Sequence, residues 1–301
     1  MSKLRAARLA RPLVGRFPQF FYRLSPLAGW LAYHLRPAVR RNVVRNMLPL
    51  CDGDLRLAKR EARQACQHVA QYWVDLASLP RRKMGRFEAE RITLVHGERL
   101  ALLEAPGPVV AVSAHMGNVE LVIQALTYRG RDFIALVEAQ KPPEWSHYLL
   151  ELRSSTGGNF HEAGFGGLRS SLSALNHGQL VGLMGDRDIQ QTGHCVELAG
   201  RKVKLPRGPW ELARRSGAVL LPVFCSRTRR DFFDVYVEEP FCVARSEDPE
   251  ADVRAAAERY ARLLEAHLRR DPGQWAVLED FWKAHACRDS DSQPESGHPS
   301  G

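Results

Sequence analysis

Residues 108–126 read PVVAVSAHMGNVELVIQAL, and the predicted fold is organised around this stretch. An apolar run of strand length comes first, a polar turn follows, and apolar residues then recur at helical spacing. In open α/β sheets the carboxyl ends of the strands form the rim where ligands bind. His115 directly follows the apolar run, so we expect it at this rim.

The turn after this strand carries a histidine and a glutamate five positions apart. Asn118 is a suitable N-cap, and it places Glu120 in the first helical turn, where the helix dipole stabilises a carboxylate. A neutral imidazole can take a proton from a hydroxyl while a nearby carboxylate orients the ring. His115 and Glu120 are therefore candidates for general-base catalysis. The alternative is that both residues only cap the helix.

Strands and helices alternate from about residue 92 onward, which predicts an α/β fold with a mostly parallel central sheet covered by helices. Helices at 38–50 and 54–78 precede this pattern. We therefore expect an N-terminal helical segment (1–90), an α/β domain (91–285) and a disordered tail (286–301) rich in Ser, Asp, Pro and Gly. Further strands are expected at 133–138, 159–162, 180–185, 218–224 and 232–238, and further helices at 143–155, 167–176, 208–216 and 250–270.

The composition limits the class of protein and its partners. A chain of 301 residues with 45% hydrophobic content can bury a sizeable core. The formal net charge of +9 favours anionic partners, namely a phosphorylated substrate, a membrane surface or a nucleic acid. The six cysteines show no Cys-x-x-Cys and no histidine at metal spacing, which argues against a zinc site or a disulfide framework. A reducing cytoplasmic compartment fits this usage best.

Residues 13–35 bear on the location of the protein. They are apolar and aromatic, but Arg16, Pro18, Arg23 and Pro26 interrupt them, so we expect neither a transmembrane helix nor a signal peptide. Aromatic side chains flanked by arginines are typical of a segment that lies in a membrane interface. The alternative is a helix packed on the domain with its arginines in solvent. The first reading predicts a peripheral or shallowly inserted protein on the cytoplasmic face of the inner membrane.

A second polar group follows another apolar run. Asp186, Arg187 and Asp188 come directly after the strand expected at 180–185, and in a parallel sheet they share the rim with His115. Two carboxylates that flank an arginine can bind a divalent metal, orient a substrate or form a structural ion-pair network. Asp-x-Asp is also the metal site of many nucleotide-sugar glycosyltransferases. A metal-dependent glycosyltransferase is therefore the alternative function.

A third feature combines a hairpin with a basic helix start. Alternating apolar residues around positions 199 and 200 predict a β-hairpin, and Pro209 marks the beginning of a helix. Lys204 and Arg207 precede this helix, whose N-terminus at Gly208 is suited to bind a phosphate. The alternative is an ordinary turn with solvated basic side chains.

Together, these motifs in this order resemble the bacterial lipid A biosynthesis acyltransferase family. This family includes the lauroyl and myristoyl transferases and the phosphatidylinositol mannoside acyltransferases, and it is similar to the lysophospholipid acyltransferases. The resemblance covers roughly residues 10–285. His115 and Glu120 match the family's His-x4-Asp/Glu signature, and Asp186 and Asp188 match its Asp-x-Asp segment. The motif His-Met-Gly-Asn-Val-Glu is more similar to that of the phosphatidylinositol mannoside acyltransferases than to that of the lauroyl transferases.

The resemblance implies an activity. A fatty acyl group would move from a thioester, acyl-ACP or acyl-CoA, to a hydroxyl of a membrane glycolipid of the lipid A precursor or phosphatidylinositol mannoside type. His115 would act as general base with Glu120 as its partner, without an acyl-enzyme, a bound cofactor, a metal or a nucleic-acid partner. Many family members begin with a membrane-spanning helix, whereas this sequence has only the interrupted apolar segment 13–35. The residues expected to contact substrate are Asn118, Glu138, Arg153, Asp186, Arg187, Asp188, Arg207 and Gly208.

Overall fold

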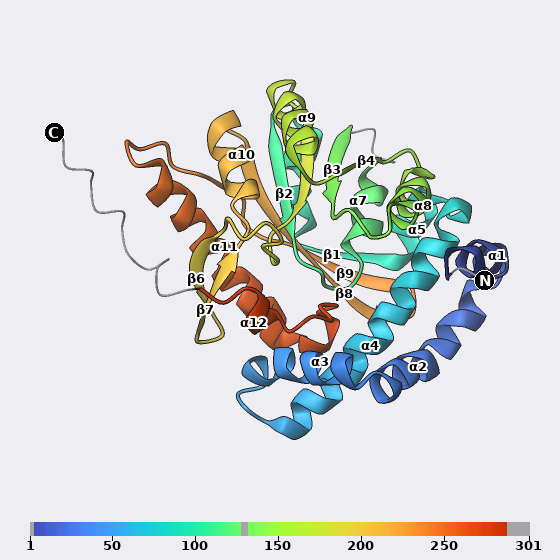
Figure 1. Ribbon diagram of the computed structural model, residues 1–301. Coiled ribbons are helices and arrows are strands. Elements are labelled where there is room, and N and C mark those ends of the chain that lie inside the picture. The colour runs from blue at the N-terminus through green and yellow to red at the C-terminus, as the bar shows by residue number, and fades with distance from the viewer. Residues whose placement is uncertain (1–2, 128–131, 288–301) are drawn as a thin grey trace.

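Within the residues that the computed structural model describes, 3–127 and 132–287, an eight-stranded mixed sheet forms the centre of the protein (Figure 1). The strand order is β1-β9-β8-β2-β5-β3-β4, and β10 pairs with β8. The strands are β1 (Ile92–Val95), β2 (Val109–Ser113), β3 (Phe133–Val137), β4 (Asn159–Glu162), β5 (Leu180–Met184), β8 (Val219–Arg229), β9 (Phe232–Val237) and β10 (Phe241–Cys242).

Strands β8, β2, β5, β3 and β4 run parallel to one another. Strands β2 and β5 are neighbours in full register, with Val109 opposite Leu180 and Ser113 opposite Met184. Their carboxyl ends therefore lie side by side at one rim. Strands β9 and β10 are antiparallel to β8. The predicted mostly parallel sheet is confirmed, and so is the shared rim.

Helices cover both faces of the sheet because alternate residues of each strand point to opposite sides. Val110 and Val112 of β2 pack with Trp210 and Tyr260 on one face, whereas Val109 packs in a second apolar cluster on the other. The helices from residue 84 onward are α5 (Met84–Arg91), α6 (Ala101–Glu104), α7 (Val119–Thr127), α8 (Pro143–Ser154), α9 (Phe165–Asn176), α10 (Gly208–Ser216), α11 (Pro249–Arg270) and α12 (Phe281–Ala284).

Four helices of the N-terminal segment pack together along one side of the molecule (Figure 1). They are α1 (Lys3–Arg16), α2 (Pro18–Leu35), α3 (Pro37–Leu50) and α4 (Leu55–Ser78). The side chain of Asp54 caps α4 by accepting hydrogen bonds from the backbone N–H groups of Arg56 and Leu57. The helices predicted at 38–50 and 54–78 are confirmed within one residue. In residues 3–127 and 132–287, no helix combines the length and apolarity needed to cross a membrane.

The predicted hairpin consists of β6 (His194–Leu198) and β7 (Arg201–Leu205). Its two turn residues, Ala199 and Gly200, both have positive φ, as a tight two-residue hairpin turn requires. Cys195 of β6 forms a disulfide with Cys287. The expectation of no disulfide is thus wrong for this pair, which is 92 residues apart in sequence and is brought together only by the tertiary fold. Most of the predicted tail, residues 288–301, lies outside the described residues.

Candidate active site

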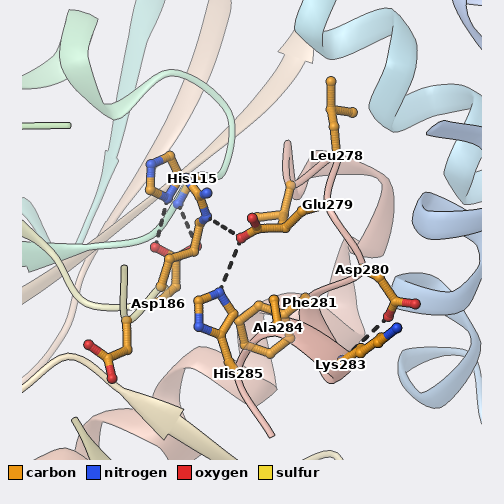
Figure 2. A network of polar contacts seen from close by, with 12 residues as sticks. His115, Asp186, Leu278, Glu279, Asp280, Phe281, Lys283, Ala284 and His285 are labelled. Carbon is orange, nitrogen blue, oxygen red and sulfur yellow. Dashed lines mark hydrogen bonds and ion pairs between the residues drawn. The ribbon is translucent and has the colours of Figure 1, made fainter. Parts of the chain in front are cut away.

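His115 and Asp186 form a hydrogen-bonded pair at the rim of β2 and β5 (Figure 2). The distance from His115 Nδ1 to Asp186 Oδ1 is 2.8 Å. An ionised carboxylate can only accept, so Nδ1 carries the proton and Nε2 keeps its lone pair. The Asp186 side chain is fully buried, whereas the His115 side chain is 30% exposed. The imidazole ring is therefore accessible to a substrate, while its hydrogen bond to the buried Asp186 fixes its orientation.

The second oxygen of Asp186 is also held. Oδ2 accepts hydrogen bonds from the backbone N–H of His115 (3.1 Å) and from the indole N–H of Trp275 (2.9 Å). Burial alone would raise the pKa of Asp186, but the positive charge that His115 carries when protonated and the hydrogen bonds from His115 and Trp275 lower it to about 2. Asp186 is therefore ionised at neutral pH.

A tight turn fixes the path from His115 into α7. Gly117 has φ +56°, and a Cβ atom there would lie 2.5 Å from the carbonyl oxygen of Cys225. Only glycine is compatible with both conditions. Asn118 Oδ1 then accepts a hydrogen bond from Leu121 N (3.1 Å), which confirms the predicted N-cap. Its Nδ2 donates to the buried carboxylate of Asp75 (2.8 Å), which sequence reasoning missed.

Glu120 does not orient His115, and this part of the prediction is wrong. Its carboxylate accepts two hydrogen bonds from Arg153, Nη2 to Oε1 at 2.7 Å and Nε to Oε2 at 2.9 Å. The hydroxyl of Tyr72 donates a third at 2.9 Å. From the first turn of α7, the side chain points to α4 and α8, whereas the neighbouring strand β5 brings Asp186 to the ring. The sequence indicates that both carboxylates share the rim, but not that β5 lies next to β2.

Arg187 connects the predicted residue Glu138 to the C-terminal part of the chain. Its Nη1 lies 3.0 Å from Glu138 Oε2, and its Nε lies 2.9 Å from Glu279 Oε1. His285 Nε2 lies 3.1 Å from the same oxygen of Glu279 (Figure 2). The hydrogen bonds from His285 and Arg187 outweigh burial and lower the pKa of Glu279 to about 2. Glu279 and His285 were missed because no motif marks them.

Of the remaining predicted contact residues, Asp188 and Arg207 have structural partners. Asp188 is buried, and its Oδ2 accepts from the backbone N–H of Gly193 (2.7 Å), which closes the loop between β5 and β6. Arg207 forms ion pairs with Glu211 and Glu250. Gly208 begins α10, and open space surrounds the position of its absent side chain. Substrate binding by these residues stays a prediction.

Asp186 and Asp188 do not converge as a pair of ligands. One carboxylate is directed at His115 and Trp275, and the other at a backbone amide. Throughout residues 3–127 and 132–287, no group of three or more His, Cys, Asp or Glu side chains is arranged to hold a metal ion.

Residues 12–284 match the family model of the bacterial lipid A biosynthesis acyltransferases. The chain belongs to this family. It is 31% identical over 228 residues to a phosphatidylinositol mannoside acyltransferase of Mycobacterium tuberculosis, which covers 72% of this chain and 69% of the relative. A phosphatidylinositol mannoside acyltransferase of Mycolicibacterium smegmatis is 28% identical over 227 residues, covering 74% of this chain and 72% of the relative.

Among solved structures, the 1-acyl-sn-glycerophosphate acyltransferase PlsC from Thermotoga maritima matches with a TM-score of 0.38 and 16% identity, covering 77% of this chain and 98% of that one. The family assignment rests on the match over residues 12–284. The matched part of the chain includes His115, Asp186 and Trp275. The family predicted from the sequence is confirmed.

Proposed function

We propose that this acyltransferase moves a fatty acyl group from a thioester to a hydroxyl of a membrane glycolipid, with His115 as general base. The observation that carries the proposal is the 2.8 Å hydrogen bond between His115 Nδ1 and the buried Asp186, on a ring that is partly exposed. Membership of the acyltransferase family and the names of the mycobacterial relatives support the same reaction class.

The pair is suited to direct acyl transfer. Nε2 of His115 removes the proton of the acceptor hydroxyl while the hydroxyl oxygen attacks the thioester carbonyl carbon. The ionised Asp186 stabilises the resulting imidazolium through Nδ1. When the tetrahedral intermediate collapses, the C–S bond breaks and the departing sulfur takes the proton from His115. The products are an ester and a free thiol, and no acyl-enzyme forms.

The developing oxyanion needs hydrogen-bond donors close to His115. The first turn of α7 begins at Val119, four residues after His115, and the first N–H groups of a helix have no acceptor within the helix. We assign the stabilisation of the oxyanion to this turn.

The substrates follow from the family and from the charge. The acceptor is a glycolipid of the lipid A precursor or phosphatidylinositol mannoside type, and the names of the relatives favour the second. The donor is acyl-ACP or acyl-CoA, both anionic and therefore attracted to a chain with a net charge of +9. Mass spectrometry of membrane lipids with and without the gene product tests this. One missing acyl chain would identify the acceptor and the acyl length, whereas an unchanged lipid profile would contradict the proposal.

Peripheral membrane association through α1 and α2, on the cytoplasmic face of the inner membrane, completes the proposal. These helices and Phe17 between them expose large apolar side chains, which a membrane interface would accept. They are Leu9, Leu13, Phe17, Phe20, Leu24, Leu27, Trp30, Leu31 and Leu35.

The proposed reaction requires no metal, which separates it from the glycosyltransferase alternative. We expect transfer by the purified protein to continue at the same rate in excess chelator. Both oxygens of Asp186 already accept hydrogen bonds from the protein, so the reaction uses this carboxylate without an ion. Loss of activity in chelator, with recovery on adding magnesium or manganese but not calcium, would favour the alternative.

A further inference from the structure

The C-terminal strap, residues 271–287, lies against the turn that carries His115. The backbone N–H of Ala276 donates to the carbonyl oxygen of His115 (2.8 Å). Met116 and Trp275 form an antiparallel bridge, and the N–H of Gly117 donates to Gln274 O (3.4 Å). The last described part of the chain therefore forms one wall of the candidate active site.

The strap is anchored independently of Asp186. The side-chain amide of Gln274 pairs with the backbone of Arg227 on β8, with distances of 2.9 and 2.8 Å. Glu279 pairs with Arg187, and the Cys195–Cys287 disulfide joins the end of the strap to β6. These contacts hold the backbone at Trp275 in place without any contribution from the Trp275 side chain.

The Trp275 indole is rigidly held inside this strap. The side chain is fully buried and packs edge-to-face on Phe281, with 4.7 Å between ring centroids. From this position its Nε1–H donates to Asp186 Oδ2 at 2.9 Å. The backbone N–H of His115 donates to the same oxygen. Two donors on Oδ2 stop the carboxylate from rotating, and this leaves Oδ1 directed at His115 Nδ1.

We propose that Trp275 is a positioning residue of the acyl transfer reaction, which acts on His115 by holding Asp186 in the orientation that the imidazole requires. Trp275 touches no substrate in this role. The inference rests on the proposed function of His115, and it adds a residue from the far end of the chain to the dyad. It also gives a role to the buried indole N–H of Trp275, whose hydrogen bond to the Asp186 carboxylate offsets the cost of its desolvation.

The chain offers a matched control. Trp282 belongs to the same aromatic cluster, with its ring centroid 6.3 Å from that of Trp275, and it is also buried. Its indole N–H donates to the backbone oxygen of Asn46, not to Asp186. Trp275→Phe and Trp282→Phe therefore remove equal volume and one hydrogen bond each, but only the first alters the dyad.

The test compares the two variants in the purified enzyme with acyl-CoA and glycolipid. For Trp275→Phe we expect kcat to fall at least about 10-fold with KM changed less than about 2-fold, because a charge-assisted bond near the reacting group is lost. The acid limb of the kcat/KM profile should move to higher pH, because Asp186 with one donor fewer attracts the proton on His115 more strongly. Trp282→Phe should change kcat less than about 2-fold and leave the limb in place.

A double-mutant cycle separates positioning from general stability. In the Asp186→Asn background, adding Trp275→Phe should lower kcat less than about 2-fold further, since the carboxylate it positions is already gone. The inference would be overturned if the loss of kcat in the double variant equalled the product of the losses in Asp186→Asn and Trp275→Phe. Equal kcat values for Trp275→Phe and Trp282→Phe would also overturn it. If Trp275→Phe unfolds, 3-benzothienylalanine at position 275 keeps the bicyclic shape without the N–H and must give the same loss.

The His115→Ala variant, assayed in parallel, distinguishes the two claims. An inactive His115→Ala with a fully active Trp275→Phe would refute only the role of Trp275. An active His115→Ala would refute the proposed function itself.

Discussion

At the scale of single residues, the proposed base depends on a carboxylate 71 positions away in the sequence. The sequence shows a histidine after an apolar strand and three acidic residues near the same rim, and it favours Glu120 because that residue is nearest in the chain. The fold instead directs Glu120 to Arg153 and Asp186 to His115. The candidate residues could be predicted from local patterns, but their pairing could not, because it depends on which strands are neighbours.

Glu120→Gln tests the structural role that replaces the predicted catalytic one. Arg153 and Glu120 form an ion pair whose side chains are 8% and 15% exposed. Removing the negative charge leaves a buried guanidinium without a counter-charge, so we expect the free energy of unfolding to fall by about 3 kcal/mol. Urea unfolding measures this.

The remaining activity of folded Glu120→Gln should exceed that of a variant that lacks the His115 ring, because the Asp186 hydrogen bond stays intact. Unchanged stability together with activity as low as that of His115→Ala would contradict the assignment and return Glu120 to the reaction itself.

At the scale of elements, the strands and helices lie close to the positions predicted from the sequence, whereas the strap was not predicted. The apolar runs at β2 and β5 and the hairpin of β6 and β7 are encoded by local periodicity and turn chemistry. Residues 271–287 carry no such signal, because their position depends on contacts with β8, β6 and the His115 turn. Trp275 was therefore absent from the predicted site.

Helix α2 carries the prediction for membrane binding. Leu27 and Trp30 expose 56% and 51% of their surface, so replacing both with Glu removes apolar contacts with a bilayer without opening a cavity. We expect binding to vesicles with anionic lipid to weaken at least about 10-fold, with unchanged thermal unfolding. Leu168→Glu on α9, where 43% of the side chain is exposed, is the matched control and should bind normally. Equal binding by the wild type and the α2 variant would show that another surface meets the membrane.

At the scale of the whole molecule, α4 joins the N-terminal helices to the strap and to the catalytic turn. His68 Nδ1 lies 2.8 Å from the carbonyl oxygen of Gly273, and Asp75 receives the hydrogen bond from Asn118. Asp75 also pairs with Arg227 of β8, and both side chains are 1% exposed. The helices that we expect to bind the membrane and the rim that carries His115 therefore belong to one continuous polar and apolar core.

His68 makes the stability of this core depend on pH. Burial, with a smaller contribution from the charge of Arg227, lowers the pKa of His68 from 6.5 to about 4. Between pH 4 and pH 6.5 the unfolded chain therefore binds more protons than the folded one. The contribution of His68 to stability is complete above pH 6.5 and is lost as the pH falls towards 4. The loss amounts to about 3 kcal/mol. Urea unfolding at pH 7.5 and 4.5 measures it, and His68→Gln should flatten the difference. An equally steep pH dependence in His68→Gln would assign it to other groups.

The most direct test of the central claim is the single-turnover rate of acyl transfer by purified His115→Ala, measured with acyl-CoA or acyl-ACP and the glycolipid acceptor. His115 is at the rim and 30% exposed at its side chain, so the substitution opens no core cavity and thermal unfolding should change little. Loss of a general base predicts a transfer rate reduced by about 10²- to 10⁴-fold with membrane binding retained. A folded, membrane-bound His115→Ala that transfers acyl groups at nearly the wild-type rate would contradict the account.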